Sequence, residues 1–389
     1  MTNDICCQVC KGKALESVKG YRYFPQITSD CKLWRGKSSL CVCKMCGSVQ
    51  KVTDRTWKKN VDSIYSRYTL YHQANGIEQA VFDIHSGKVF RRSERVFQYL
   101  KTKIRLSSSG RYLDLGCGSG NTLRYFSKFR PLWSMAGTEL GCKHRKEIEI
   151  ISKRSSFYSC PFKKIPGTFN LITILHLLEH IVDPVPFLIE ARNKMADTGT
   201  IVIDIPDYRQ NPFDLFVFDH CTHFTVETLR AVLARAGLEA IDINASLIPK
   251  ELVVIAKKVK MLKGHNYDAK TSVKTSSRDS VAEALVWVKQ FLGKVTEVAQ
   301  QDNFGIFGTS IIATWLLGKI GRHVKFLVDE DPLRHGKTYM DLPIYHPQDI
   351  PEGSNVFLAL PYDMAMEISK RLHRKDVRFY IPPPFKICG

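Results

Sequence analysis

The stretch Asp114-Leu-Gly-Cys-Gly-Ser-Gly120 constrains the fold of this chain more than any other segment. It follows an apolar run that ends in Tyr112-Leu113, and it precedes a segment with helical spacing, residues 122–129. A strand that enters a glycine-rich turn and then a helix forms a site for a nucleotide-like ligand. Glycine lets the backbone approach the ligand, and the helix N-terminus offers free N–H groups. Asp114 stands where the strand ends, so we expect its carboxylate to face the ligand rather than the core.

Six further apolar runs follow this turn and are separated by segments with helical spacing. With residues 111–115 they predict seven strands, the others being 133–137, 157–159, 170–175, 200–205, 239–245 and 252–256. The last two runs are joined by a short turn and should pair antiparallel. Alternating strands and helices predict an open parallel α/β sheet with ligands at the carboxyl ends of its strands. The glycine loop and the seven strands resemble the class I S-adenosylmethionine (SAM) methyltransferases, with their Rossmann-like sheet. The resemblance implies SAM as the cofactor, held by Asp114, Gly116, Gly118 and Gly120.

Glu139 closes the second predicted strand, 25 residues after Asp114. An acid about 20 residues beyond a glycine loop commonly accepts hydrogen bonds from the ribose hydroxyls of a bound cofactor. The alternative role is that of a neighbour to a helix N-cap. Because the residue stands at a strand end, we favour the ribose contact for Glu139.

Two cysteine pairs near the N-terminus have the spacing of metal ligands. They are CxxC motifs with 32 residues between them, and two such turns complete a tetrahedral zinc site. Four sulfur ligands leave no open position, so we expect this zinc to be structural. Free thiols are the alternative interpretation, and the flanking Cys6 and Cys41 leave some choice of ligands open. The predicted ligands are Cys7, Cys10, Cys43 and Cys46.

Length and charge suggest several domains and a basic N-terminal region. A chain of 389 residues exceeds one ordinary core, and we expect domains at 1–75, 76–257 and 258–389. Residues 1–110 hold 20 Lys/Arg and 8 Asp/Glu, whereas residues 111–245 hold 16 and 15. The basic excess fits a polyanion partner or an ordinary solvated surface. No long apolar run or signal peptide stands out, so we expect a cytoplasmic protein without a membrane partner.

Histidines follow the fourth and fifth predicted strands. The segments are Leu175-His-Leu-Leu-Glu-His180-Ile-Val-Asp-Pro184 and Phe216-Val-Phe-Asp219-His220-Cys-Thr-His223. Histidine titrates near neutral pH and therefore suits a general base. We expect the carboxylate of Asp219 to orient His220 and make it more basic. A surface loop with fortuitous histidines is the alternative, and a metal site on the two loop histidines lacks an evident third ligand.

Taken together, these motifs resemble the sugar C-methyltransferases that act on nucleotide-linked 4-keto-6-deoxy sugars. The resemblance covers nearly the whole chain: a zinc module, a SAM domain and a C-terminal Rossmann-like α/β domain that begins its own strand–turn–helix near Gly305. It implies methylation at C3 through an enolate, with His220 as base. His180 and a tyrosine of the segment Tyr65-Ser-Arg-Tyr68-Thr-Leu-Tyr71 would bind the oxyanion, with Tyr68 and Tyr71 as the matching positions. The chain departs from the family by having Asp219 where the family has glutamate.

Two other functions deserve comparison with this prediction. A zinc-containing RNA base methyltransferase would use the basic N-terminal third for phosphate contacts. The neutral central region and the long C-terminal region argue against it, so we expect no nucleic-acid partner. A scaffold with an inactive SAM fold is disfavoured because the glycine loop and Glu139 are intact. The residues do not indicate an oligomeric state.

Overall fold

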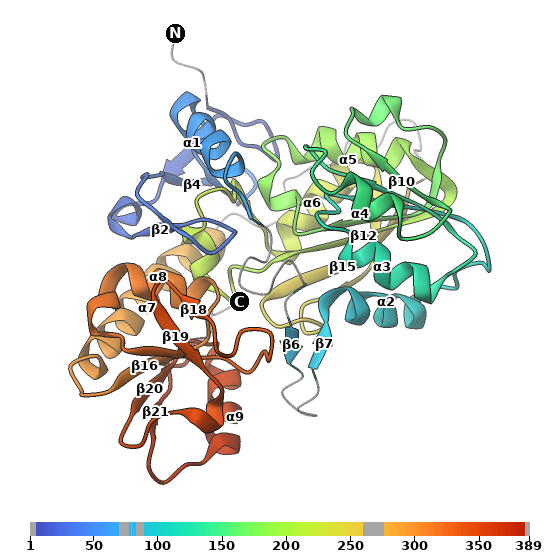
Figure 1. Ribbon diagram of the computed structural model, residues 1–389. Coiled ribbons are helices and arrows are strands. Elements are labelled where there is room, and N and C mark those ends of the chain that lie inside the picture. The colour runs from blue at the N-terminus through green and yellow to red at the C-terminus, as the bar shows by residue number, and fades with distance from the viewer. Residues whose placement is uncertain (1–4, 70–77, 79, 83–88, 260–275, 386–389) are drawn as a thin grey trace.

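The computed structural model describes residues 5–69, 78, 80–82, 89–259 and 276–385. Three larger sheets and two further sheets of two strands each organise these residues (Figure 1). An N-terminal module, residues 5–69, lies against one end of a seven-stranded central sheet, and a C-terminal part, residues 276–385, packs beneath that module. Two short strands, β6 (Ala80–Phe82) and β7 (Val89–Arg91), form a hairpin before the central sheet.

The central sheet has the strand order β10-β9-β8-β11-β12-β15-β14. Only β15 runs antiparallel to its neighbours, β12 and β14, and the other pairs are parallel. The order reverses beside β8, and in open α/β sheets ligands bind at such a point. The strands are β8 (Arg111–Leu115), β9 (Ser134–Thr138), β10 (Ser155–Tyr158), β11 (Phe169–Leu175), β12 (Met195–Pro206), β14 (Leu238–Asn244) and β15 (Glu251–Lys258).

Helices cover both faces of this sheet, which explains why its strands read as continuous apolar runs. In β12, Ile201 and Ile203 pack toward α5 and α6, whereas Val202 packs toward α2 and α3 on the other face. Thr225 caps α6 through a reciprocal hydrogen-bond pair with Thr228. The helices are α2 (Arg92–Lys103), α3 (Asn121–Phe129), α4 (Arg145–Glu149), α5 (Pro184–Asn193) and α6 (Val226–Arg235).

The N-terminal module contains a sheet that borrows a strand from the central region. Its order is β1-β4-β5-β13. The strand β13 (Thr222–His223) begins some sixteen residues after the end of β12, a strand of the central sheet. The segment that contains His220 is therefore held by the N-terminal module. The remaining elements are β1 (Leu15–Ser17), β2 (Gln26–Ile27), β3 (Leu33–Trp34), β4 (Leu40–Cys43), β5 (Val49–Lys51) and α1 (Arg55–Tyr65).

The C-terminal part is a second α/β unit with the strand order β18-β19-β17-β16-β20-β21. Its core continues into the N-terminal module: Trp315 of α8 packs against Phe216 with the two rings tilted, and it donates a hydrogen bond to the carbonyl of Pro25. Its elements are α7 (Ser276–Val298), β16 (Phe304–Phe307), α8 (Ile311–Ile320), β17 (Phe326–Val328), β18 (Thr338–Tyr339), β19 (Leu342–Tyr345), β20 (Asn355–Leu358), α9 (Tyr362–Leu372) and β21 (Arg378–Tyr380).

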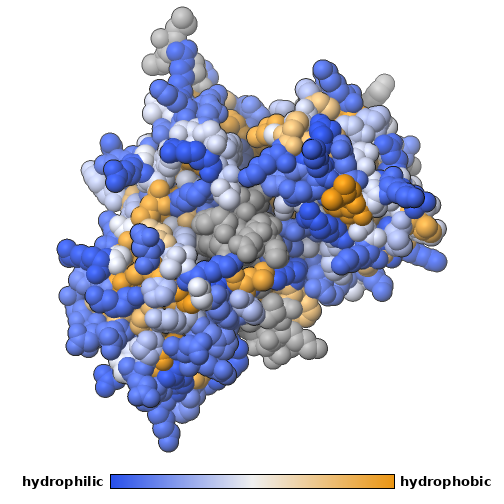
Figure 2. All heavy atoms as spheres, in the orientation of Figure 1, coloured by the Kyte–Doolittle hydropathy of each residue, from blue (hydrophilic) through white to orange (hydrophobic). Residues whose placement is uncertain are grey.

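The seven predicted strands of the central sheet are confirmed, including the antiparallel final pair. The strand expected at residues 200–205 is longer, because β12 begins at Met195. Figure 2 shows a mostly hydrophilic face with hydrophobic residues in small, separate groups. Among the described helices, none combines the length and apolar character of a membrane span.

Candidate active site

The glycine loop leaves β8 and enters α3 at the carboxyl edge of the central sheet. Gly116, Gly118 and Gly120 all have left-handed backbone, with φ of 73°, 50° and 82°, which side chains other than glycine rarely adopt. Gly120 is the N-cap of α3, so the free N–H groups of that helix face the loop. A Cβ added at Gly116 would lie 3.0 Å from the side chain of Leu177, so the loop packs directly on the turn that contains His180.

Asp114 does not face open space, contrary to the expectation from the sequence. β8 continues to Leu115, and the Asp114 side chain lies within the sheet, where Oδ1 accepts a hydrogen bond from Thr173 at 2.6 Å. Burial raises the pKa of Asp114 to about 7, against the effect of that hydrogen bond. Its Oδ2 is buried and has no hydrogen-bond partner among the residues that the structure describes. A contact between this oxygen and a cofactor stays a prediction.

Glu139 follows β9 directly and binds the glycine loop. Its Oε2 accepts a hydrogen bond from the backbone N–H of Gly118 at 3.1 Å, and Oε1 accepts one from Leu140 at 2.9 Å. The predicted cofactor residues Gly118 and Glu139 are thus in contact, although they come from different strand–helix units. The half-buried carboxylate stands at a strand end beside the loop, as a ribose-binding acid requires.

His180 lies at the end of a short 3-10 turn, η4 (Leu178–His180), after β11. Its Nδ1 is 3.0 Å from the hydroxyl of Tyr65 and 3.1 Å from the carbonyl oxygen of Asp219. Burial and the neighbouring His220 lower the pKa of His180, so the ring is neutral near pH 7. The ring packs edge-to-face on His220, with 4.6 Å between ring centroids. The two predicted histidines are therefore direct neighbours.

The carboxylate that orients His220 is Asp214, not Asp219, so the predicted pairing is wrong. Asp214 lies in η5 (Pro212–Phe216), a 3-10 turn that places it under the histidine loop. Its Oδ1 is 2.7 Å from Nδ1 of His220, and its Oδ2 is 2.6 Å from Nδ1 of His223. Asp219 instead accepts hydrogen bonds from the backbone and hydroxyl of Ser29.

Both histidines donate to one carboxylate, which argues against a metal ion held by that pair. Burial lowers the pKa of His220, but the charge and hydrogen bond of Asp214 outweigh this effect and raise it. His223 is more deeply enclosed, and burial lowers its pKa to about 4 despite the same carboxylate. The pKa of Asp214 lies well below its usual value, because the attraction of the two histidines overcomes the cost of its burial. With Nδ1 donating to Asp214, Nε2 is the nitrogen of His220 that can accept a proton.

A buried lysine lies behind this group. Lys51 is fully enclosed and donates hydrogen bonds to the carbonyl of Leu215, at 2.7 Å, and to the hydroxyl of Tyr21. Burial lowers its pKa to about 7, although Asp214 and Asp219 oppose the shift. The histidine loop is thus fixed by polar contacts with the N-terminal module as well as by β13.

The tyrosine that reaches the histidines is Tyr65, at the end of α1. Tyr68 packs on Tyr65 at 5.8 Å, and its hydroxyl lies 3.1 Å from that of Ser29, which donates to Asp219. Tyr68 therefore lies one contact away from His180, and Tyr71 lies outside the described residues. The sequence contains Tyr65 in the same tyrosine-rich segment, and helical spacing places it one turn before Tyr68, but spacing alone does not indicate which of them reaches His180.

The four predicted zinc ligands form one cluster in the N-terminal module. The Sγ atoms of Cys7 and Cys46 are 3.5 Å apart, and those of Cys10 and Cys43 are 3.6 Å apart. Tetrahedral zinc with Zn–S bonds of about 2.3 Å places its sulfurs roughly 3.8 Å apart. The arrangement therefore fits a closed metal site, and Cys6 and Cys41 lie outside this cluster.

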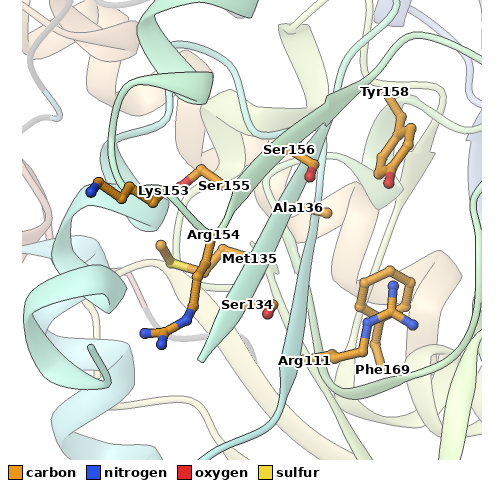
Figure 3. A pocket seen from close by; sticks show the side chains of 10 residues that line it. All are labelled: Arg111, Ser134, Met135, Ala136, Lys153, Arg154, Ser155, Ser156, Tyr158 and Phe169. Carbon is orange, nitrogen blue, oxygen red and sulfur yellow. The ribbon is translucent and has the colours of Figure 1, made fainter. Parts of the chain in front are cut away.

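A small recess at the opposite edge of the sheet is not part of this site. Its volume is about 290 Å³, and it lies at the amino ends of β8, β9, β10 and β11. Figure 3 shows the guanidinium of Arg111 against Phe169, with Tyr158 beside them. Because parallel sheets of this kind bind ligands at the carboxyl ends of their strands, the recess is remote from the expected cofactor.

Comparisons with known proteins find matches among methyltransferases. Residues 86–243 match the family described as methyltransferase domain. An uncharacterized methyltransferase of Schizosaccharomyces pombe is 26% identical over 146 residues, which is 34% of this chain and 50% of the yeast protein. The chain thus spans about half the length of this curated relative.

Solved structures that resemble the chain include CalO1, a methyltransferase in calicheamicin biosynthesis. It is 15% identical, with a TM-score of 0.35 over 41% of this chain and 52% of CalO1. A methyltransferase in complex with the Haloferax volcanii Trm112 activator is 13% identical, with a TM-score of 0.38 over 43% of this chain and 91% of that one. The fold assignment rests on the strand order and the family match. The central sheet thus has the class I SAM methyltransferase fold, and most of its strands lie within the residues that match the methyltransferase-domain family.

Proposed function

We propose that the protein is a SAM-dependent C-methyltransferase that acts at C3 of a nucleotide-linked 4-keto-6-deoxy sugar. The glycine loop and Glu139 would hold SAM, which supplies the methyl group. The observation that carries the proposal is the joint construction of the site: Tyr65 of the N-terminal module contacts His180 of the methyltransferase domain at 3.0 Å. Such a site places a neutral histidine, a phenol and a carboxylate-bound histidine together beside the cofactor loop.

The side chains suit proton removal next to a ketone. A 4-keto group acidifies the hydrogen on C3, and His220 would remove this hydrogen through Nε2 while Asp214 stabilises the imidazolium that forms. Negative charge then develops on the keto oxygen. The Tyr65 hydroxyl would donate to that oxygen while it accepts from Nδ1–H of the neutral His180, and fixed donors of this kind are among the largest contributions to catalysis. The C3 carbanion is the nucleophile that accepts the methyl group.

Loss of Glu139 should weaken SAM binding. We expect Glu139→Ala to raise the Kd for SAM about 10- to 100-fold, because hydrogen bonds to a charged group contribute about 1.5–3 kcal/mol. Isothermal titration calorimetry would measure the change. Glu147→Ala removes the same charge from an exposed position of the neighbouring α4 and should bind SAM like the parent protein. Equal affinities of both variants would contradict the ribose contact.

We also propose that the cysteine cluster holds one structural Zn²⁺. Cys43→Ser should lose the metal and lower the Tm, because binding energy at a closed zinc site contributes directly to folding. Cys41→Ser changes a buried thiol of the same strand that lies outside the cluster, and it should retain one zinc per chain. Elemental analysis of both purified proteins measures the stoichiometry. A zinc-free parent protein, or equal zinc in both variants, would contradict this assignment.

The substrate class can be tested by incubation with SAM and a panel of 4-keto-6-deoxy sugars linked to TDP, GDP or CDP. Mass detection should show the gain of one methyl group on at least one nucleotide sugar. Transfer RNA in a parallel reaction represents the RNA base methyltransferase. Methylation of the RNA and of none of the sugars would overturn the proposal and favour the alternative.

A further inference from the structure

A second group of polar side chains gathers at the carboxyl edge of the central sheet, beside the histidine pair. His176 follows β11, Asp204 lies in β12, and Glu251 begins β15. Their potential ligand atoms all lie within 4.8 Å of one another. Nε2 of His176 is 3.2 Å from Oε1 of Glu251 and 3.8 Å from Oδ2 of Asp204. The reaction proposed above uses none of these three residues.

Three atoms of this group are buried without a hydrogen bond among the described residues. They are both carboxylate oxygens of Asp204, a fully buried residue, and Nε2 of His176. Buried polar atoms in native proteins almost always have a partner, so their convergence on one point indicates a ligand that bonds to all of them. The atoms left without a hydrogen bond belong to one carboxylate, Asp204, and one imidazole nitrogen, and lone pairs of this kind suit a cation.

Neighbouring residues orient the side chains of this group, as the neighbours of metal ligands usually do. Nδ1 of His176 is 3.3 Å from Oε1 of Glu179, and metal-bound histidines usually donate their second nitrogen to a carboxylate. Arg92 binds both oxygens of Glu251, at 2.7 and 3.0 Å, and its Nε is 3.6 Å from Asp204. These contacts leave Nε2 of His176 and the carboxylate of Asp204 as the atoms that can bind a ligand between the two residues.

The backbone at His176 is strained. The residue has left-handed backbone with φ of 50°, a conformation that residues other than glycine rarely adopt. Such strain persists where the surroundings hold it and is common at functional sites.

We propose that His176, Asp204 and Glu251 bind a divalent cation of the Mn²⁺ or Zn²⁺ class. One imidazole nitrogen with two carboxylates suits these metals better than Ca²⁺ or Mg²⁺, which take oxygen ligands. The side chain of His176 is 28% exposed, and the group lies at the carboxyl edge of the sheet. Contact between the cation and an oxygen of the methyl acceptor rests on the proposed function, whereas the binding site itself does not.

Mn²⁺ titration of the full chain loaded with a single equivalent of Zn²⁺, which the four cysteines take up, tests the site when free Mn²⁺ is followed by electron paramagnetic resonance. Mn²⁺ prefers oxygen and nitrogen ligands, so the cysteine cluster does not compete for it. We expect one saturable Mn²⁺ per chain. Asp204→Asn and His176→Gln should weaken it at least tenfold, and Glu179→Gln by about 10- to 100-fold. Asp197→Asn, an exposed carboxylate in the same strand, should bind Mn²⁺ like the parent protein.

Several outcomes would overturn this inference. One is the absence of saturable binding to the parent protein at millimolar Mn²⁺. Another is unchanged binding in His176→Gln. Because His176 is only half-buried, this variant remains informative even if Asp204→Asn does not fold. Loss of binding in His220→Gln with retention in His176→Gln would place the ion on the neighbouring group Glu179, His180 and His220 instead. A protein that transfers methyl groups without binding Mn²⁺ would overturn this inference alone and leave the proposed function intact.

Discussion

Replacing His220 with glutamine is expected to lower kcat for methyl transfer by about 10²- to 10⁴-fold, the usual contribution of a general base. The reason is that Nε2 of His220 is the free nitrogen of a ring whose Nδ1 is bound to Asp214 at 2.7 Å. Glutamine retains a polar side chain of similar length but cannot accept the proton. Steady-state kinetics would measure the change in kcat, and calorimetry should show unchanged SAM affinity because His220 is not among the cofactor residues.

The matched control is His223→Gln, three residues away. His223 donates to the same carboxylate but is fully buried, so it cannot reach a substrate. We expect a smaller loss of kcat, caused by a less firmly held Asp214. Exchange of the C3 hydrogen with D₂O, in the absence of methyl transfer, should be abolished in His220→Gln and retained in His223→Gln. Normal exchange in His220→Gln would exclude His220 as the base.

The second large effect is expected for Asp214→Asn. An amide cannot stabilise the imidazolium or enforce the same tautomer, and such a change beside a catalytic histidine costs up to about 10⁴ in rate. The base must be neutral to act, so the rate rises as pH passes upward through the pKa of His220. Asp214 raises this pKa, and its removal should therefore shift the rising limb of the pH–rate profile to lower pH. A purely structural role would lower the rate without this shift.

The same substitution should destabilise the fold in a pH-dependent way. Breaking a buried ion pair costs about 3–5 kcal/mol. Because the pKa of Asp214 in the folded protein is depressed, its contribution is complete above the ordinary carboxyl pKa of about 3.9 and is lost as pH falls below it. The difference in Tm between the parent protein and Asp214→Asn should thus shrink in acid.

Two controls isolate the role of Asp214. Asp207→Asn replaces another buried carboxylate nearby, one that binds Arg209 and Gln210, and should leave the pH–rate profile in place. Asp219→Asn examines the pairing that the sequence suggested. It removes the contacts to Ser29 and only a smaller electrostatic contribution to the pKa of His220, so the rising limb should move less than in Asp214→Asn. A shift in Asp219→Asn and none in Asp214→Asn would contradict the observed hydrogen bonds.

The central sheet was predictable because its signals are local. Strands covered on both faces read as apolar runs, and the glycines at 116, 118 and 120 mark a turn that needs left-handed backbone. The cysteine cluster was equally accessible, since a repeated CxxC spacing indicates two turns that converge. These features depend on residues that are close in the sequence, so they can be predicted without knowledge of tertiary contacts.

The partners inside the site were not predictable in the same way. Asp219 is adjacent to His220 in sequence, yet η5 turns the chain so that Asp214 reaches the ring and Asp219 points toward Ser29. Asp114 lies inside the sheet because β8 extends one residue beyond it. The choice of Tyr65 likewise depends on where α1 packs. Each outcome depends on contacts between segments that are far apart in the sequence, which spacing does not encode.

The most direct measurement of the central proposal is the position of the transferred methyl group. The enzyme would be incubated with ¹³C-methyl-labelled SAM and the nucleotide-linked 4-keto-6-deoxy sugar, and the product examined by nuclear magnetic resonance. The account predicts a labelled methyl bonded to ring carbon C3, with carbon–carbon coupling to the ring in a uniformly labelled sugar. A labelled methyl on a hydroxyl oxygen, or on RNA in place of the sugar, would contradict it.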